Sequence, residues 1–462
     1  MCGVVGIIGK ADVSFDLYKS MLALQHRGQD SAGISVFNGT SISTKKEVGL
    51  VTQVFNDENL SLLKGEMGIG HVRYATAGSN PKNDAHPFTL ESPRQMALAF
   101  NGNIVNHKEV RSNREYTNCD AETLLHMLSD GLAGKEITPE TIFESVGAIM
   151  EKANGGYSTV CLIEGLGLLA FRDPNAIRPL AMGKNNEGAI AFASETVAFD
   201  SIGFDYVRNI KPGEAVFVTN SLQVHEKSIR PMERRHCMFE WVYFARPDSV
   251  IEGQSVYEAR IALGTEAGKL LKKNGEEVVV AVPDTSRIAA LALGRHLNLP
   301  IEEGLIKNRY IGRTFIMPTH GERESALKVK FNSIGPVIQG KEIFLVDDSI
   351  VRGSTAKKIV KEVKKKAKSV HFVSTCPPIK NPCYYGIDFP IKEELIAVNK
   401  SVEEIKQELG VDGLTYMTME GLKESLKQKG ICTGCLDGNY PTKITPEMER
   451  QIVEGRKKAR GG

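Results

Sequence analysis

The spacing of apolar runs divides the chain into two parts with different patterns of predicted strands and helices. In the first part, short apolar runs alternate with turns rich in glycine and asparagine, and each run has the length of a β-strand. Two helices are predicted among them, one at residues 14–25, with Phe15 and Leu22 on one face, and one that begins near Asp120. Many short strands with few helices indicate stacked sheets covered by helices. The predicted strands are residues 4–8, 34–37, 97–100, 159–163, 168–171 and 189–193.

After about residue 250 the pattern of apolar runs changes. The apolar runs at residues 278–282, 343–346 and 370–374 are unbroken, and predicted helices alternate with them. Unbroken apolar strands that alternate with helices indicate a parallel sheet covered on both faces. We therefore predict two domains of different architecture, with a boundary near residues 225–250. The predicted units are residues 1–230, residues 250–430 and a C-terminal segment of residues 431–462 with a polar tail.

Composition narrows the class of protein. The chain has 462 residues, of which 41% are hydrophobic and 25% charged, and a net charge of +2 argues against a partner that is a nucleic acid or a membrane surface. No stretch approaches the ~18 consecutive apolar residues of a membrane span, and no signal-peptide pattern is found. We therefore expect a cytoplasmic protein. Thiols stay reduced there, so the eight cysteines should be core residues, nucleophiles or metal ligands rather than disulfides.

The strongest chemical signal follows the second strand of the parallel sheet, in the sequence IFLVDDSIVRGST at residues 343–355. Ligands of such sheets bind at the carboxyl ends of the strands. The turn after this strand offers backbone N–H groups, hydroxyls and a helix N-terminus to a phosphate. Asp347 and Asp348 suit ribose hydroxyls and a divalent cation, since hard cations take oxygen ligands. The alternative is a capped turn with exposed carboxylates, but the complete pattern favours a binding site.

This segment resembles the phosphoribosyl pyrophosphate signature of type I phosphoribosyltransferases, in which the Asp pair contacts the ribose and the loop holds the 5-phosphate. The resemblance also implies a magnesium ion at Thr285, Asp347 and Asp348. The residues that match the phosphoribosyl pyrophosphate site are Asp347, Asp348, Ser349, Arg352, Gly353, Ser354 and Thr355.

Two further stretches fit the same site. The sequence PDTS at residues 283–286 follows the first strand of the parallel sheet, where a ligand-facing loop belongs. Residues 307–332 form a long basic segment without predicted secondary structure, and such segments are often lids. Its cations, among them Lys328 and Lys330, would complement pyrophosphate, while a solvated surface loop is the alternative.

Three other patterns in the sequence have simpler interpretations. No Gly-Lys-Ser or Gly-Lys-Thr of a Walker A site occurs in the chain. The sequence GLGLLA at residues 165–170 is similar to a dinucleotide-binding motif, but a strand follows it, so a hairpin turn is predicted. The lysines of residues 357–368 could indicate nucleic acid, yet Ile359 and Val363 form an apolar stripe among them. We predict a helix with a solvated basic face there.

Cys2 directly precedes the first predicted strand. If Met1 is removed, the α-amino group of Cys2, which titrates at about 7.7–8.0, can take the proton of its own thiol. While Met1 is attached, that nitrogen is an amide and cannot act as a base. A small buried hydrophobe is the commoner role of a cysteine, and it is the alternative for Cys2.

Three motifs in the same domain favour the nucleophile. Acyl transfer from an amide needs an oxyanion hole, and the Asn101 side chain with the Gly102 backbone N–H is such a pair. Arg73 suits a substrate carboxylate and Asp120 suits an ammonium group. A lone Asn-Gly would indicate a hairpin turn instead. The motifs are LQHRGQDSAG at residues 24–33, GHVRYAT at residues 70–76 and FNGN at residues 100–103.

These motifs are similar to those of the class II glutamine amidotransferase domain, an N-terminal nucleophile hydrolase with a four-layer αββα sandwich. The resemblance implies that glutamine is cleaved through a thioester at Cys2 and that ammonia is released. It assigns catalysis to Cys2, Asn101 and Gly102, and glutamine binding to Arg73, Thr76 and Asp120.

Together the two halves resemble the amidophosphoribosyltransferase family over nearly the whole chain, and the sequence CMFEWVYFARPDS at residues 237–249 is also typical of it. The resemblance implies that ammonia passes inside the enzyme to the second site. There it displaces pyrophosphate and gives 5-phosphoribosylamine, in the first committed step of purine biosynthesis, while magnesium neutralises the leaving group. The family also implies a homotetramer and feedback inhibition by purine nucleotides.

The sequence CTGC, with Cys432 and Cys435, could by itself bind zinc, form a redox pair or occur by chance. Cys237 and Cys383 match positions of the cluster-bearing branch of the family, in which four thiolates hold one 4Fe–4S cluster per chain. The residues alone do not separate this cluster from a tetrahedral zinc site. None of the four lies in a motif assigned to the chemistry, so a structural role is expected. Cys119, Cys161 and Cys376 are expected to be core thiols.

One feature departs from the cluster-bearing branch, whose members often carry a short propeptide, because only Met1 precedes Cys2. Two other functions were considered. A different glutamine amidotransferase, such as a hexosamine-phosphate synthase or an asparagine synthetase, is disfavoured by the signature at residues 347–355. A regulatory phosphoribosyl-pyrophosphate-binding protein without catalysis is disfavoured by the intact set of residues around Cys2.

Overall fold

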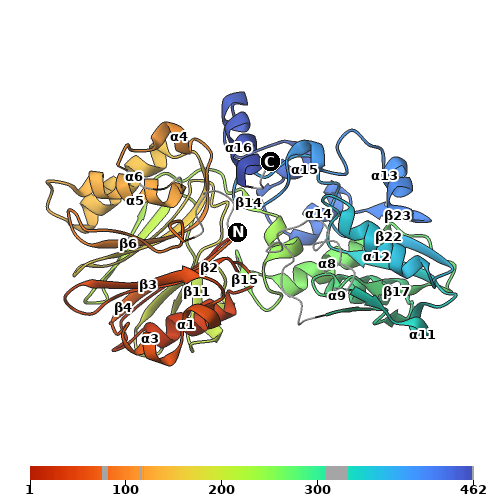
Figure 1. Cartoon of the computed structure of the whole chain (residues 1–462), viewed down its shortest axis with the longest axis horizontal. Helices are drawn as coiled ribbons and strands as arrows, with labels where there is room; N and C mark the ends of the chain where they lie inside the picture. The colour runs from red at the N-terminus through yellow and green to blue at the C-terminus, as the bar shows by residue number, and fades with distance from the viewer. Residues whose placement is uncertain (75–81, 115–116, 118, 309–330, 460–462) are drawn as a thin grey trace.

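The computed structural model describes residues 1–74, 82–114, 117, 119–308 and 331–459. The N-terminal half and the C-terminal half lie side by side, and helix α16 (Pro446–Ala459) rises beside their junction (Figure 1). Thr76, Lys328 and Lys330 lie outside the described residues, as does most of the segment predicted as a lid.

Two antiparallel sheets form the N-terminal half. Their strand orders are β11-β9-β10-β1-β4-β2-β3 and β13-β12-β8-β7-β6-β5. The first sheet contains β1 (Gly3–Ile8), β2 (Ser31–Phe37), β3 (Ile42–Val48), β4 (Met67–Arg73), β9 (Ala181–Lys184), β10 (Ile190–Ala193) and β11 (Asp205–Asn209). The second contains β5 (Phe88–Leu90), β6 (Met96–Ile104), β7 (Gly155–Ile163), β8 (Gly167–Arg172), β12 (Glu214–Thr219) and β13 (Val224–Ser228).

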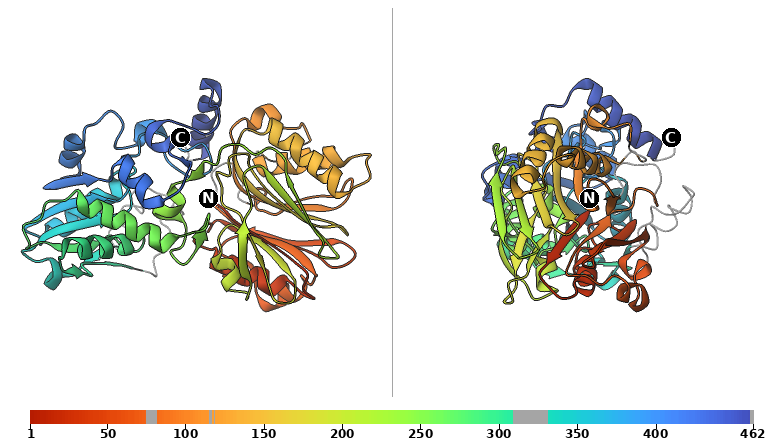
Figure 2. Two further views of the ribbon diagram at one scale, coloured as in Figure 1. Left: turned by 180° about the vertical axis from the view of Figure 1, so that it is seen from behind. Right: turned by 90° about the vertical axis from the view of Figure 1, so that its left-hand side faces the viewer.

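Helices cover the outer faces of both sheets, which gives four layers. Helix α1 (Ser14–Ala23) packs on the first sheet, and α5 (Asp120–Leu132) with α6 (Pro139–Lys152) covers the second (Figure 2). The alternation of β1 explains why its residues are all apolar or glycine. Val5 and Ile7 face α1, while Val4 and Ile8 face the second sheet. The predicted αββα sandwich is confirmed.

The C-terminal half is built on a five-stranded sheet of order β18-β17-β21-β22-β23, and all its paired strands are parallel. Apolar clusters lie on both of its faces, as the unbroken apolar strands predict. Its strands are β17 (Val278–Ala281), β18 (Ile301–Glu302), β21 (Glu342–Asp347), β22 (Ser369–Ser374) and β23 (Gly413–Tyr416). Its helices are α8 (Val256–Lys269), α9 (Arg287–Leu297), α12 (Ser354–Lys364), α13 (Val402–Leu409) and α14 (Met419–Leu426).

Short elements connect these units. They are α2 (Val51–Val54), α3 (Asp57–Ser61), α4 (His107–Val110), α7 (Val197–Asp200), β14 (His236–Cys237), the π-helix η1 (Glu240–Phe244), β15 (Val250–Ile251), β16 (Gln254–Ser255), β19 (Leu305–Lys307), β20 (Phe331–Ser333), α11 (Gly335–Ile338), the 3₁₀-helix η3 (Lys392–Glu394), β24 (Ile431–Cys432) and α15 (Gly434–Asp437).

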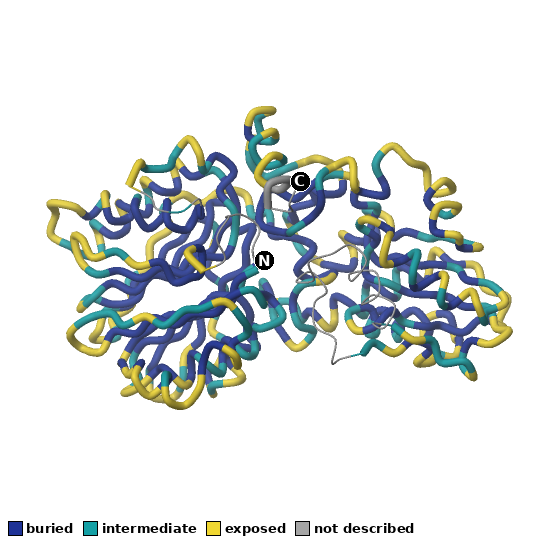
Figure 3. The backbone as a smooth tube through the Cα atoms, viewed as in Figure 1, coloured by how far each residue is buried: buried dark blue, intermediate teal, exposed yellow. Residues whose placement is uncertain are grey.

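Segments that are far apart in the sequence meet at the junction. Strand β14, in the connection between the halves, pairs in parallel with β24 near the C-terminus. One apolar cluster includes Met1 and Ile177 from the N-terminal half and Trp241 and Leu436 from later segments. Buried backbone therefore continues from one half to the other (Figure 3).

Two sequence interpretations of glycine and lysine patterns are confirmed. Residues 164–166 form the hairpin turn between β7 and β8, with Gly165 at a φ of +64°, and residues 167–170 belong to β8. Helix α12 buries Ile359 and Val363, while the lysines around them are not buried. Within the described part of the chain, no helix is long and apolar enough to cross a membrane.

The expected absence of secondary structure at residues 307–332 is wrong at the two ends of that segment. Lys307 closes β19 and Phe331 opens β20, and the two strands pair in antiparallel fashion. Each of these strands has only three residues, LIK and FNS, which is too short to show a periodicity, so their pairing could not be predicted from the sequence.

Candidate active sites and the junction between them

Cys2 lies where β1 begins, beside β6 and the end of β4. Its backbone N–H donates to Oδ1 of Asn101 over 3.2 Å, and its thiol donates to the backbone oxygen of Tyr74 over 3.6 Å. The side chain of Cys2 is partly exposed, whereas Asn101 is fully buried. The thiol is thus accessible, while its neighbours are fixed by the sheets.

Asn101 and Gly102, the predicted oxyanion-hole pair, lie next to each other in β6. The bond from Cys2 fixes the Asn101 amide, and its Nδ2 has no hydrogen-bond partner within the described residues although it is buried. An unpaired buried donor costs about 1–3 kcal/mol, so an acceptor from outside the chain is indicated. Gly102 must be glycine, because a Cβ there would lie 2.1 Å from the backbone oxygen of Gly156.

Arg73 and Asp120 lie close to this centre on two buried elements. Arg73 ends β4, and its Nη2 is 3.6 Å from Oδ2 of Asp84. Asp120 opens α5, and its Oδ2 accepts the backbone N–H of Ile104 over 2.9 Å. Burial raises the pKa of Asp120, while nearby positive groups, including Arg73, oppose the shift. The pair offers a guanidinium for a carboxylate and a carboxylate for an ammonium group.

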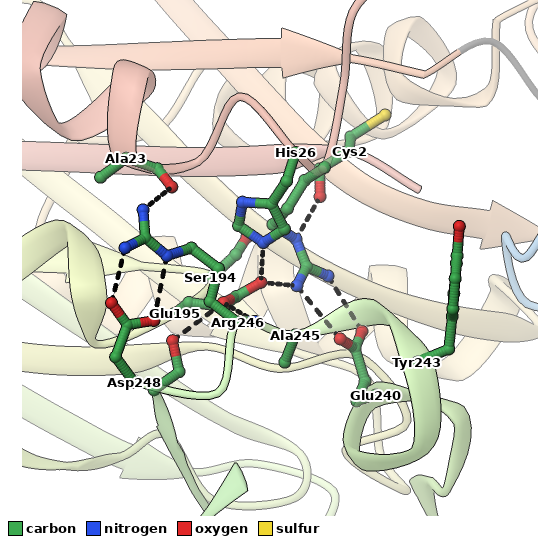
Figure 4. A network of polar contacts seen from close by, with 12 residues as sticks. Cys2, Ala23, His26, Ser194, Glu195, Glu240, Tyr243, Ala245, Arg246 and Asp248 are labelled. Atoms are coloured by element: carbon green, nitrogen blue, oxygen red, sulfur yellow. Dashed lines mark hydrogen bonds and ion pairs between the residues drawn. The ribbon is translucent and has the colours of Figure 1, made fainter. Parts of the chain in front are cut away.

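A buried ionic network holds the backbone of Cys2 from the other side (Figure 4). Arg27 donates from Nε to the backbone oxygen of Cys2 over 3.0 Å, and its other nitrogens bind Glu195 and Glu240. Burial alone would lower the pKa of Arg27, but Glu240 and Glu195 raise it above its ordinary value. Arg27 therefore stays charged and ties the backbone of Cys2 to η1 in the connection between the halves.

Sequence reasoning did not assign a role to these residues. Arg27 lies inside the quoted LQHRGQDSAG motif, which is the signal that could have identified it. Glu240 likewise lies inside the segment CMFEWVYFARPDS at residues 237–249, whereas Glu195 lies in none of these motifs and is identified only by its contact with the Arg27 guanidinium.

The carboxylate pair lies at the carboxyl end of β21. The backbone N–H of Asp348 donates to Oδ1 of Asp347 over 2.9 Å, and the hydroxyls of Thr285 and Ser349 donate to the Asp348 carboxylate. Thr285 follows β17, the parallel neighbour of β21, so both strand ends reach the same edge. Burial raises the pKa of both aspartates, and the charge of Asp348 raises that of Asp347 further. A divalent cation bound between the two carboxylates would stabilise their charged forms and lower both pKa values again.

The turn after the carboxylates opens α12 at its N-terminus. Gly353 has a φ of +76°, and a Cβ there would lie 2.3 Å from Cδ1 of Ile396, so only glycine fits. Ser354 and Thr355 form the exposed first turn of α12, where free backbone N–H groups can bind a phosphate. Arg352 donates from Nε to Glu394 over 2.8 Å at the rim of this turn.

Four buried cysteines gather at the junction. Cys237 in β14 is paired in register with Cys432 in β24, and Cys383 and Cys435 belong to the same buried cluster. Burial raises the pKa values of Cys237, Cys432 and Cys435, and neighbouring cysteines in the group raise them further. Without a bound cation these three thiols would stay neutral. Cys119, Cys161 and Cys376 are buried, as expected.

Comparison with known proteins decides the family. A family model described as a glutamine amidotransferase domain matches residues 71–201. The chain is 45% identical over 460 residues to an amidophosphoribosyltransferase of Methanothermobacter thermautotrophicus, covering 97% of this chain and 96% of the relative. It is 41% identical over 478 residues to one of Pseudomonas aeruginosa, with 98% and 95% covered. The chain belongs to the amidophosphoribosyltransferase family.

Solved structures agree with this assignment. The glutamine phosphoribosylpyrophosphate amidotransferase of B. subtilis, complexed with ADP and GMP, superposes with a TM-score of 0.88 at 36% identity. That similarity covers 96% of this chain and 98% of the other. As an amidophosphoribosyltransferase, the protein catalyses the first step of purine biosynthesis, and its two halves carry the amidotransferase fold and the phosphoribosyltransferase fold.

The amidophosphoribosyltransferase is expected to bind magnesium and phosphoribosyl pyrophosphate more weakly as pH falls. Asp347 and Asp348 have raised pKa values, so they take up protons at a higher pH than ordinary aspartates and must release them to bind a cation. Calorimetry at pH 6–8 in two buffers of different ionisation enthalpy would measure this proton release. Asp348→Asn should reduce it, and equal heats in both buffers for the wild type would contradict the prediction.

Proposed function

We propose that this amidophosphoribosyltransferase releases ammonia from glutamine at Cys2 and transfers it to phosphoribosyl pyrophosphate held at Asp347 and Asp348. The observation that carries the proposal is the buried Nδ2 of Asn101, which has no partner among the residues that the structure describes, beside the accessible thiol of Cys2. Such an arrangement suits a developing oxyanion, since a preorganised donor aimed at new charge is a large part of catalysis.

The first reaction is acyl transfer at Cys2. After removal of Met1, the free α-amine takes the thiol proton, and Sγ attacks the side-chain amide carbon of glutamine. The oxyanion is stabilised by Asn101 Nδ2 and the Gly102 N–H, and the amine returns its proton to the leaving ammonia. Water then cleaves the thioester to give glutamate. The substrate is held by Arg73, Thr76 and Asp120.

Removal of Met1 also changes the packing beside the nucleophile. Met1 is 2% exposed in the unprocessed chain, and burial lowers the pKa of its amine to about 5. In the unprocessed chain the nitrogen of Cys2 is part of a peptide bond and cannot act as a base. The free α-amine belongs to Met1, and at neutral pH it is mostly unprotonated. Cleavage would move the free amine to Cys2, where Asn101 Oδ1 already accepts from this nitrogen.

The second reaction is displacement at the sugar. The helix α12 N-terminus binds the 5-phosphate, and ammonia attacks the anomeric carbon as pyrophosphate leaves. Magnesium, when bound, neutralises charge on the leaving pyrophosphate, and Thr285, Asp347 and Asp348 would hold it. The remaining contacts to phosphoribosyl pyrophosphate are assigned to Ser349, Arg352, Gly353, Ser354, Thr355, Lys328 and Lys330.

Passage of ammonia inside the enzyme is supported by the junction. Nδ2 of Asn103, next to the oxyanion hole, donates to the backbone oxygen of Tyr384 over 2.9 Å. The hydroxyl of Tyr74 donates to Asp388 over 3.3 Å, and a Cβ on Gly386 would lie 3.1 Å from the backbone oxygen of Gly102. A segment of the C-terminal half is thus packed directly on the glutamine site.

The proposal of two coupled active sites can be tested by measuring glutamate and pyrophosphate release from one enzyme preparation supplied with phosphoribosyl pyrophosphate and magnesium. With glutamine, glutamate and pyrophosphate should be released in equal amounts. With free ammonia, pyrophosphate should be released without glutamate. Glutamate release without any pyrophosphate, under the same conditions, would contradict the assignment of the second centre.

The four cysteines are assigned to one 4Fe–4S cluster per chain, as in the cluster-bearing branch of the family. A tetrahedral zinc site is the alternative that four cysteines leave open. Four thiolates are the usual ligand set of a 4Fe–4S cluster, which would here cross-link β14, β24 and the segment around Cys383.

Metal analysis tests this assignment. About four iron atoms and four acid-labile sulfides are expected per chain in protein purified without oxygen. Replacing Cys435 with serine should lower both values and destabilise the junction, while replacing the core thiol Cys161 with serine should leave the iron content unchanged. Zinc without sulfide in the wild type would refute the cluster.

The regulatory and organisational assignments follow the family. The B. subtilis relative was solved with ADP and GMP, which supports purine nucleotides as feedback inhibitors here, and a homotetramer is proposed with them. The domain limits are proposed as residues 1–230 and 250–430, followed by a C-terminal segment of residues 431–462. The sandwich strands end at Ser228, and the parallel sheet spans Val278 to Tyr416, which supports this division.

A further inference from the structure

Arg178 is a fully buried arginine at the junction with two donors that no described residue accepts. Its side chain has no exposed surface, and neither Nε nor Nη2 has a hydrogen-bond partner within the described residues. The third nitrogen, Nη1, contacts the sulfur of Met1 and lies 3.7 Å from Oε1 of Glu240. A buried guanidinium with unpaired donors is strongly destabilising, so an acceptor other than the described residues is indicated for these nitrogens.

The backbone locks Arg178 against the tetracysteine group, defined as Cys237, Cys383, Cys432 and Cys435. The carboxylate of Asp173 accepts the backbone N–H of Ile177 over 2.9 Å and that of Arg178 over 3.4 Å, which fixes the turn after β8. Cys237 then donates its backbone N–H to the oxygen of Ile177 over 3.2 Å. The residue after Ile177 is therefore held beside the first cysteine of the group.

The charges around Arg178 point to sulfur as the missing acceptor. Burial alone would lower the pKa of Arg178, but Cys237, Cys383, Glu240 and Cys432 raise it. Glu240 is already bound by Arg27, whose Nη2 lies 2.9 Å from Oε1 of that glutamate. The unpaired nitrogens of Arg178 thus share their surroundings with three members of the tetracysteine group.

We propose that Arg178 donates Nε–H and Nη2–H hydrogen bonds to the sulfur atoms of the iron–sulfur cluster held by the tetracysteine group. The inference rests on the proposed cluster. Four thiolates give such a cluster a net negative charge, and hydrogen bonds to its sulfurs together with a nearby cation favour its reduced state. Arg178 would therefore raise the reduction potential of the cluster and slow the loss of its iron.

The experiment begins with iron and sulfide in the wild-type enzyme and then compares Arg178→Lys and Arg178→Met. The matched control is Arg172→Lys, at a second fully buried arginine whose guanidinium binds the backbone oxygens of Ala176 and Ile210 and the carboxylate of Glu252. A redox titration monitored by electron paramagnetic resonance gives the potential of the cluster. Anaerobic transfer of iron to a ferrous chelator gives its stability, and neither measurement depends on turnover.

We expect a lower reduction potential in both Arg178 variants, with the larger shift in Arg178→Met. Iron should be lost about tenfold faster or more in Arg178→Met, as expected when charge-assisted hydrogen bonds are removed. Arg178→Lys keeps the charge but replaces the planar fork of donors with a single ammonium group, so it tests the placement of the hydrogen bonds even if Arg178→Met does not fold. Arg172→Lys should retain the wild-type potential.

Two results would overturn the inference in distinguishable ways. If the wild type contains iron and sulfide but Arg178→Lys has an unchanged potential and an unchanged rate of iron loss, the role of Arg178 is wrong and the cluster stands. A wild type without iron and sulfide removes the cluster, and the inference about Arg178 with it.

Discussion

Replacing Cys2 with alanine is expected to abolish glutamine-dependent turnover while turnover with free ammonia continues. Without the thiol no thioester can form, so glutamate release should fall at least about 10⁴-fold. The phosphoribosyl pyrophosphate site lies in the other half of the chain and contains no group contributed by Cys2. Pyrophosphate release from ammonia should therefore stay within a few-fold of the wild type. Both activities can be measured in one preparation from the two ammonia sources.

The control for this experiment is Cys161→Ala. Cys161 is completely buried in β7, on the face of the second sheet that packs against α5 and α6, and it has no assigned role in either reaction. This variant should lose some stability, since it leaves a small cavity, but it should keep both activities. Loss of ammonia-dependent turnover in Cys2→Ala would contradict two separable centres.

Most of the fold could be predicted from the sequence, because each of its local patterns is compatible with few kinds of structure. In β1, alternate residues serve two different apolar layers, so a run of Val, Ile and Gly is what a strand between layers requires. The motif at residues 343–355 likewise combines a strand, a tight turn and a helix start, each with its own residue preferences. Gly353 illustrates this, because its positive φ strongly favours glycine and a Cβ there would displace the end of the Ile396 side chain.

The sequence singled out the four cysteines of the junction but not the buried arginines beside them. Arg178 and Arg260 lie in no recognised motif, and Arg27 lies in one without an assigned role, because the burial of all three depends on partners that are distant along the chain. Arg260 donates to the backbone oxygens of three residues in and next to η1, and its charge also faces Asp348. The residues that make such a contact belong to different elements of the chain, so only the tertiary structure reveals it.

These arginines connect the two centres through buried polar contacts. Arg27 joins the backbone of Cys2 to Glu240 at the start of η1, and Arg260 binds the other end of that helix. Replacing one of these buried charged residues would leave its partner as an uncompensated charge in the protein interior. We therefore expect such a substitution to destabilise the junction strongly. Substitutions at the phosphoribosyl pyrophosphate site must therefore be chosen to preserve shape as well as hydrogen bonds.

Asp348→Asn meets that condition and is expected to remove phosphoribosyl transfer from both ammonia sources. Asparagine keeps the shape and can still accept from Thr285, but it loses the charge that would hold magnesium. Loss of several kcal/mol of charge stabilisation corresponds to about 10²–10³-fold slower pyrophosphate release. Glutamate release by Cys2, measured without phosphoribosyl pyrophosphate, should stay near the wild-type rate.

The effect of Asp348→Asn on stability should have the opposite sign from its effect on activity. The pKa of Asp348 is raised in the folded protein, so its charged form at neutral pH opposes folding, and a neutral amide should keep or raise the melting temperature. Asp412→Asn is the matched control on the same sheet. Burial alone would raise the pKa of Asp412, but hydrogen bonds from Val370 and Lys364 lower it, so its charge favours folding. That variant should melt at a lower temperature and remain active, and an inactive Asp412→Asn enzyme would show that loss of charge anywhere on this sheet is enough to stop transfer.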